Sequence, residues 1–278
     1  MTKSPQDELY RRYLGILGWV GDPGLHELVS SHLIKVPYEN VTQLLAANAG
    51  HAGELQPSLQ PIGSFLDGIA ERDLGGDDFT IPIHFASLLQ YLDYEVELLG
   101  ADIGGVPRSH AVCRVRFEDT HYLVDIGYGV PFYQPISLAA LPHIVFHGDF
   151  QLAIDRHVAG AGAVEVATLR GGNKVQSYVA KPPPLAADGF AAAIQRAADP
   201  AGRAQRSLRI SRFFASRVLE VYDNNLVTTH HNITTITPIR DIEELEAIVR
   251  DQLQLTRLPV REAVEVLRSR GVDIFAGG

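Results

Sequence analysis

The apolar residues of this 278-residue chain change their spacing, from a helical period to the alternation that is typical of strands. Helical spacing is found first, in segments 10–20, 25–36 and 79–92. Strand-type runs follow at 94–101, 110–117 and 122–126. Because blocks of helices and blocks of strands follow one another instead of alternating, the pattern predicts an α+β fold.

The rest of the chain extends this pattern in two further blocks. Short β runs separated by glycines continue from 150 to 180, and the segment Lys181-Pro182-Pro183-Pro184 ends them. A β meander is predicted at 218–237, and helices at 242–255 and 260–270, the first with Asp241 as its N-cap. We therefore expect three domains, a helical domain at 1–92, a β-barrel or sandwich at 93–185, and an α/β domain at 186–278.

Composition and charge exclude several classes of protein. The chain has 33 acidic and 24 basic residues, for a formal net charge of −9, which weighs against a nucleic-acid or membrane-surface partner. No apolar run is long enough to span a membrane and the first 17 residues do not resemble a signal peptide, so we expect a soluble, cytoplasmic protein. Cys113 is the single cysteine, which excludes an intrachain disulfide and a cysteine-based zinc site, and His230-His231 lacks partners at ligand spacing, so no metal is predicted.

One histidine and one aspartate are candidates for acid–base chemistry. His110 begins the second strand-type run and Asp125 ends the third. A β-hairpin turning at 118–120 would bring these two strand ends near each other. In such a pair the carboxylate orients the imidazole, which then moves a proton to or from a reacting group.

Several segments, in order, resemble arylamine N-acetyltransferases. They are HLIKVPYENV (32–41), LGGDDF (74–79), SHAVCRV (109–115), YLVDIGYG (122–129) and the C-terminal run from RISRFFASRVLEVY (209–222) to IEELEAIVRDQLQL (242–255). That family transfers an acetyl group from acetyl-CoA to aromatic amines and hydrazines through a cysteine thioester. The resemblance covers nearly the whole chain and implies a helical domain, a β domain and a C-terminal α/β lid. It also supplies the family's histidine and aspartate positions at His110 and Asp125.

The resemblance departs from the family at the reaction centre. Asp78 falls where the family has its nucleophilic cysteine, and Leu74 where it has an arginine. An aspartyl anhydride is a poor replacement for a thioester because it lies uphill and hydrolyses readily. Two interpretations of Asp78 stay open, a third catalytic group beside His110 or an N-cap of the helix that follows.

Four other residues near this centre are candidates. Phe79, His84 and Tyr128 are expected to contact substrate, although a histidine beside an apolar helical stripe is also typical of a core residue. Cys113 lies at an odd offset from His110 on one predicted strand, so the two side chains should point to opposite faces, and a buried structural cysteine is the better interpretation.

The leading hypothesis is an enzyme of small-molecule, biosynthetic metabolism that acts on an acyl or carbonyl substrate without a cysteine thioester. Either His110 activates an acceptor that attacks an acyl thioester directly, or Asp78 and His110 act together in cyclisation, condensation or hydrolysis. The first mechanism requires acetyl-CoA, another acyl-CoA or an acyl carrier protein as co-substrate, and no bound cofactor is predicted. The alternatives are a conventional acetyl-CoA-dependent N-acetyltransferase and a catalytically silent ligand-binding homologue.

Overall fold

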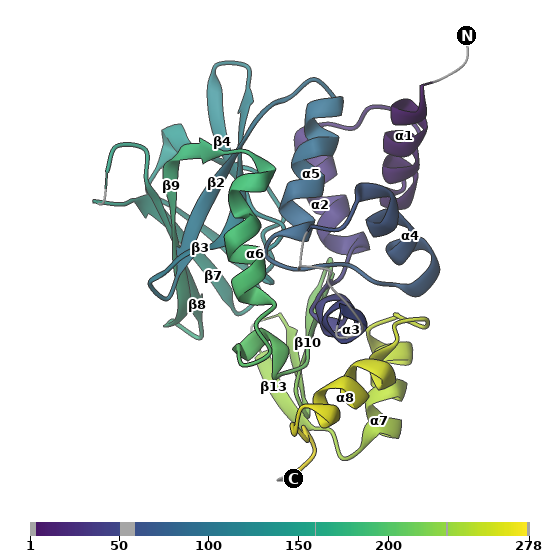
Figure 1. Cartoon of the computed structure of the whole chain (residues 1–278). Helices are drawn as coiled ribbons and strands as arrows, with labels where there is room; N and C mark the ends of the chain where they lie inside the picture. Colours follow the sequence, from purple (N-terminus) through teal and green to yellow (C-terminus); the bar gives the residue numbers. More distant parts are fainter. Residues whose placement is uncertain (1–3, 51–58, 159, 232, 277–278) are drawn as a thin grey trace. The chain divides into compact units, whose positions relative to one another are not determined.

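The computed structural model describes residues 4–50, 59–158, 160–231 and 233–276 (Figure 1). The chain divides into two compact units, each built from two separate segments. Unit 1 comprises Met1–Lys35 and Asp78–Phe190, and unit 2 comprises Val36–Asp77 and Ala191–Gly278. The α+β class is confirmed, whereas the division into three domains stays a prediction.

Three helices belong to unit 1: α1 (Pro5–Leu17), α2 (Leu25–Lys35) and α5 (Thr80–Tyr91). Helix α1 begins with a capping box, in which the Ser4 hydroxyl accepts from the Asp7 N–H and the Asp7 carboxylate accepts from the Ser4 N–H. It ends at Gly18, which adopts the left-handed conformation that favours glycine. These helices confirm the three helical segments predicted for this part of the chain, with boundaries that differ by a few residues.

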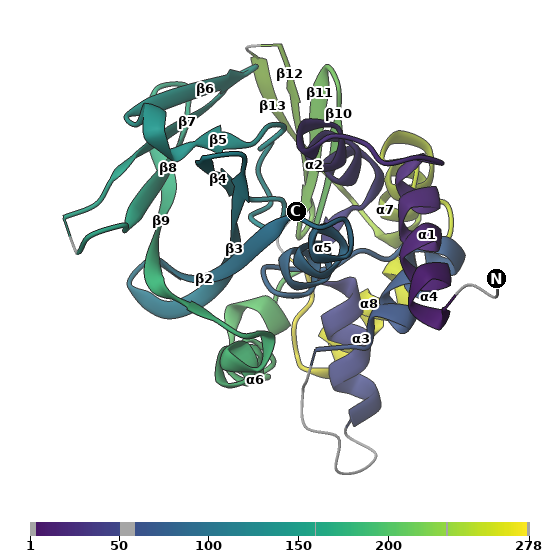
Figure 2. The same cartoon turned by 90° about the horizontal axis from the view of Figure 1, so that it is seen from above.

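The β structure of unit 1 is an eight-stranded antiparallel sheet in the order β5-β4-β3-β2-β9-β8-β7-β6, which curls strongly (Figure 2). Its strands are β2 (Glu95–Ile103), β3 (Val106–Phe117), β4 (Thr120–Val124), β5 (Ile136–Ser137), β6 (His143–His147), β7 (Phe150–Arg156), β8 (Val164–Arg170) and β9 (Asn173–Leu185), with short helical turns at η1 (Leu138–Ala140) and η2 (Ala187–Phe190). The predicted hairpin is present, since Phe117 pairs with Thr120 across the turn. Buried apolar residues from most of these strands form one core, which includes Leu99, Val112, Leu123, Val166 and Tyr178.

Strand β9 ends the β region of unit 1 directly after the proline segment, as predicted, but the prolines lie within the strand and not after it. The strand continues through Pro182-Pro183-Pro184 to Leu185. Prolines cannot donate to a ladder, and the pairing of β2 with β9 is irregular at this point, where the register shifts between Leu98 and Gly100. The bulged pairing explains how a strand accommodates three consecutive prolines.

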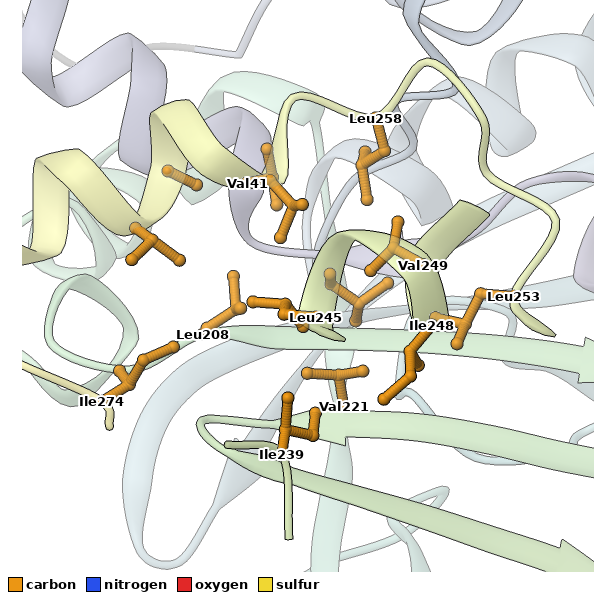
Figure 3. Close-up of a cluster of buried hydrophobic side chains, with 14 of the residues drawn as sticks. Val41, Leu208, Val221, Ile239, Leu245, Ile248, Val249, Leu253, Leu258 and Ile274 are labelled. Carbon is orange, nitrogen blue, oxygen red and sulfur yellow. The ribbon is translucent and has the colours of Figure 1, made fainter. Parts of the chain in front are cut away.

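Unit 2 packs helices against a five-stranded antiparallel sheet in the order β1-β10-β11-β12-β13. The elements are β1 (Tyr38–Glu39), α3 (Val41–Gly50), α4 (Ile62–Arg72), α6 (Ala191–Ala197), η3 (Arg203–Gln205), β10 (Arg209–Phe214), β11 (Arg217–Tyr222), β12 (Asn225–His230), β13 (Ile233–Pro238), α7 (Ile242–Ala247), a π-helical segment η4 (Ile248–Gln252) and α8 (Val260–Ser269). Buried side chains of α3, β10, β11, β12, α7, η4 and α8 meet in one apolar cluster, part of which is drawn in Figure 3. The predicted N-cap is confirmed, because the Asp241 carboxylate accepts from the Glu244 N–H at 2.8 Å.

No helix in the described part of the chain is both long and apolar enough to cross a membrane. Across residues 4–50, 59–158, 160–231 and 233–276, the His, Cys, Asp and Glu side chains also form no group of three that could hold a metal ion.

Candidate active site

Two of the sequence motifs are bonded to each other within unit 2. The Glu39 N–H donates to the Gly76 carbonyl at 2.8 Å, and Tyr38 and Gly76 form a parallel β-bridge. The Gly75 N–H donates to Glu39 Oε1 at 2.9 Å. Gly75 must be glycine, because a Cβ there would lie 1.8 Å from the Pro37 carbonyl oxygen. The PYENV and LGGDDF segments are therefore physical partners, which their distance in the sequence does not reveal.

Glu39 and Asn40 are both buried and fix this corner of the chain. Burial raises the pKa of Glu39, although its carboxylate accepts hydrogen bonds from the Thr42 hydroxyl, the Thr42 N–H and the Gly75 N–H. The Asn40 amide donates to the carbonyls of Ala204 and Ser207 at 2.8 and 2.7 Å, and its oxygen accepts from the Arg209 N–H at 2.8 Å. These bonds tie the start of α3 to the edge of the five-stranded sheet.

Asp78 lies just before α5 and contacts His110 on β3. Its carboxylate Oδ1 lies 3.5 Å from His110 Nδ1, and its main-chain carbonyl oxygen lies 3.2 Å from the same nitrogen. The same carbonyl accepts from the Ala111 N–H at 3.0 Å, which joins the start of α5 to β3. Helix α5 has Phe79 as its N-cap, so Asp78 lies one residue before that cap. Its carboxylate lies beside the imidazole, and its two interpretations, as a cap of the helix and as a catalytic group, both stay predictions.

The structure brings His110 and Asp125 together on the neighbouring strands β3 and β4. His110 Nε2 lies 3.0 Å from Asp125 Oδ2, and Asp125 Oδ1 accepts from the Gly127 N–H at 3.2 Å. Neither side chain is exposed. Burial alone would lower the pKa of His110, but the charges and hydrogen bonds of Asp125 and Asp78 outweigh it, and the net effect raises that pKa. The imidazole therefore lies between two carboxylates that stabilise its protonated form.

Two buried tyrosines enclose this imidazole. The ring centroid of Tyr128 lies 5.4 Å from that of His110, and Tyr178 on β9 lies 5.3 Å from it. The tyrosine rings contact each other edge to face at 4.7 Å. Burial raises the pKa of Tyr178 well above its usual value, and the nearby Asp125 carboxylate raises it further. The sequence did not predict a role for Tyr178, because no local motif marks it. It lies on a different strand, 68 positions after His110.

Of the other predicted contacts, Phe79 and His84 are both buried on or beside α5. The Phe79 ring lies 6.1 Å from that of Phe190. His84 interacts electrostatically with His32 of α2, whose Nε2 lies 2.7 Å from the Tyr13 hydroxyl. His84 thus belongs to the polar interior of the helical part of unit 1, and its role as a substrate contact stays a prediction.

Cys113 is buried, as predicted, and its thiol is inert. Its Sγ donates to the Pro82 carbonyl at 3.5 Å, so it faces α5, whereas the His110 ring faces the two tyrosines. Burial raises the pKa of the thiol, and the charge of Asp125 raises it further. Burial and the contact with α5 agree with the prediction of a structural cysteine.

Comparison with known proteins identifies the family. Residues 23–259 match the N-acetyltransferase family model. No curated protein sequence matches the chain. The fold is similar to arylamine N-acetyltransferases of known structure. That of Mycobacterium abscessus has a TM-score of 0.79 and 16% identity, with 98% of this chain and 100% of the other covered.

Two further relatives show the same likeness. The Nocardia farcinica enzyme has a TM-score of 0.77 and 21% identity over 93% of this chain and 92% of the other. The Mycobacterium marinum enzyme in complex with CoA has a TM-score of 0.77 and 17% identity over 94% of this chain and 97% of the other. The family match over most of the length, joined to this fold, shows that the chain belongs to the arylamine N-acetyltransferase family.

Proposed function

We propose that this protein is an acyltransferase that moves an acyl group from a thioester directly to a small nucleophilic acceptor, with Asp78 as general base and no acyl-enzyme intermediate. One observation carries the proposal. The Asp78 carboxylate lies 3.5 Å from His110 Nδ1, while His110 Nε2 lies 3.0 Å from Asp125. A carboxylate thus lies within ion-pair distance of the imidazole at the position where the family has its thiol, while the hydrogen bond of His110 Nδ1 is to the main-chain carbonyl of Asp78.

The exposure of the three side chains, Asp78, His110 and Asp125, indicates which of them can contact the substrate. The side chains of His110 and Asp125 are 0% exposed, whereas that of Asp78 is 29% exposed. In the first of the two mechanisms expected from the sequence, His110 itself activates the acceptor. That mechanism requires an imidazole that the acceptor can reach. We therefore assign the contact with the acceptor to Asp78, and assign His110 and Asp125 to orienting it and balancing its charge.

The proposed step conserves atoms and protons. The acceptor nitrogen attacks the thioester carbonyl, and Asp78 takes a proton from the nitrogen as the C–N bond forms. Collapse of the tetrahedral adduct breaks the C–S bond, and the departing sulfur takes the proton from Asp78, so that amine and thioester yield amide and thiol and the carboxylate is restored. Because the acceptor attacks before the thiol leaves, donor and acceptor must both be bound, which predicts sequential kinetics and not a ping-pong pattern.

The choice of a thioester donor is supported by family membership and by the M. marinum relative in complex with CoA. Acetyl-CoA, another acyl-CoA or an acyl carrier protein could present such a thioester. We place the reaction in the biosynthesis of small molecules.

Thiol release tests the proposal. Purified protein is incubated with acetyl-CoA, or with S-acetyl-N-acetylcysteamine as a mimic of a carrier-bound thioester, and a panel of amines and hydrazines. We expect thiol release that depends on the acceptor, falls at least a hundredfold in Asp78→Asn and His110→Ala, and leaves no acetyl group on the protein by intact mass. Asp78→Cys is the matched comparison, since it restores the family's thiol and should accumulate an acetylated enzyme.

Two results would refute the mechanism. Thiol release in the absence of any acceptor would indicate a hydrolase, and acetylated wild-type protein would indicate covalent catalysis. No release from either donor, with the fold intact, would favour a ligand-binding homologue.

A further inference from the structure

We infer that a groove at the C-terminal end of helix α5 binds an aliphatic polyamine. The groove lies within unit 1, has a volume of about 920 Å³, and is walled by α1, the α1–α2 loop, the end of α5 with the loop after it, and the hairpin of β3 and β4. Helix α5 begins next to Asp78 and has 12 residues, so on the order of 18 Å of helix separates this groove from Asp78. The inference does not depend on the proposed function, because none of Asp78, His110 and Asp125 lines the groove.

The lining of this groove is acidic. It contains five carboxylates and two guanidiniums, which belong to Asp7, Asp22, Asp93, Glu95 and Glu118 and to Arg11 and Arg116. The Arg116 guanidinium is paired with Glu95 at 3.2 Å. In the part of the chain that the structure describes, the exposed carboxylates of Asp22, Asp93 and Glu118 form no hydrogen bond or ion pair. Three negative charges are therefore available to a cationic ligand.

The end of α5 adds to the negative potential of the groove. The C-terminal end of a helix carries a partial negative charge, and a basic residue in the last turn usually offsets it. Helix α5 has no basic residue in its last turn, and its final residue, Tyr91, lines the groove. The backbone and the carboxylates thus favour a ligand of the same sign.

Three aromatic rings line the same groove and reach solvent. Phe117 is 45% exposed, and Tyr91 and Tyr94 are half-buried. The rings of Tyr94 and Phe117 lie 6.0 Å apart, while Tyr91 stacks on Tyr10 at 4.7 Å and its hydroxyl donates to Asp7 at 3.2 Å. An aromatic face attracts an ammonium group and packs against its alkyl stem, so the rings favour an organic cation. A bare metal ion fits less well, since the described His, Cys, Asp and Glu side chains form no group of three that could hold one.

The spread of the available carboxylates indicates how many charges the ligand carries. Asp22 lies in the α1–α2 loop, Asp93 follows α5, and Glu118 lies in the β3–β4 turn. An ion pair needs its nitrogen within about 4 Å of a carboxylate oxygen, so one ammonium group cannot serve three separate segments. A polyamine carries several ammonium groups on one flexible chain, and the groove falls within the roughly 300–1,000 Å³ that small-molecule sites occupy.

Calorimetric titration with spermidine tests the inference. We expect saturable one-to-one binding to the wild-type protein, and binding about tenfold weaker in the double variant Asp93→Asn/Glu118→Gln. The matched control is Asp119→Asn/Asp188→Asn, which removes two charges from exposed positions of unit 1 that do not line the groove, and it should bind as the wild type does. Phe117→Leu removes a ring and no charge, and should weaken binding about threefold.

Several results would overturn the inference. They are an absence of saturable binding, an equal loss in the two double variants, and a larger loss of spermidine affinity in MgCl₂ than in NaCl of the same ionic strength. Tighter binding of tetralysine than of spermidine would also overturn it, since the groove would then fit a basic protein segment. Far-UV circular dichroism establishes that each variant is folded before it is titrated.

Discussion

Replacement of Gly75 by alanine is the sharpest test of how the two family motifs are held together. A Cβ at Gly75 would lie 1.8 Å from the Pro37 carbonyl oxygen and 2.8 Å from its carbon, and both atoms belong to the backbone. The contact can be relieved only if the segments separate. Separation breaks the bond from the Gly75 N–H to the buried Glu39 carboxylate and the two backbone bonds between Gly76 and residues 37 and 39.

The cost follows from these three bonds. A hydrogen bond to a charged group contributes about 1.5–3 kcal/mol and each backbone bond about 1 kcal/mol, so Gly75→Ala should lower the free energy of unfolding by about 4 kcal/mol. The assay is urea denaturation followed by far-UV circular dichroism. Gly63→Ala is the control in the same unit, because nothing lies within 4 Å of its Cβ and alanine in a helix should be neutral or stabilise by up to about 1 kcal/mol. A Gly75→Ala protein within about 1 kcal/mol of wild type would refute the argument.

Two further substitutions test the buried histidines. Asp125→Asn should lower the pKa of His110 below its wild-type value, because burial would then act without the opposing charge of Asp125, and an unchanged imidazole titration by NMR would show that Asp125 does not set it. Burial lowers the pKa of His32 to about 3. Between pH 3 and the ordinary pKa of about 6.5, the unfolded state therefore binds a proton that the folded state does not. The free energy of unfolding should then fall by about 1.4 kcal/mol for each unit by which the pH decreases in this range. His32→Phe should flatten that slope in denaturation measured at pH 5 and 6.5, and a slope equal to wild type would assign the effect to other groups.

The parts of the fold that sequence predicted well depend on local signals. Strands β3 and β4 were predicted because alternating apolar residues flank a short polar turn, and the pairing of Phe117 with Thr120 is what such a turn dictates. That hairpin also placed His110 near Asp125. The helix after Gly75-Gly76 was predicted from its apolar spacing alone.

The parts that sequence did not predict depend on contacts between distant segments. Tyr178 meets His110 only because β9 pairs with β2, a pairing that no local pattern encodes. The three prolines lie inside the same strand because its pairing with β2 is irregular there, with extra residues on β9 between the partners of Leu98 and Gly100. The contact of the Asp78 carboxylate with the His110 imidazole likewise joins residues 32 positions apart in the chain.

The position of Asp78 beside His110 and Asp125 suggests how a family whose reaction uses a thiol can accommodate a carboxylate. Asp78, His110, Asp125 and the two enclosing tyrosines all belong to unit 1, and the carbonyl of Asp78 is bonded to the Ala111 N–H whatever its side chain is. This backbone bond does not depend on whether residue 78 carries a carboxylate or a thiol. The two side chains differ in chemistry, because a carboxylate is a poor acyl carrier but can accept a proton. Under the proposed function, the histidine and aspartate that would activate a nucleophile hold a base instead, and acyl transfer would require no covalent intermediate.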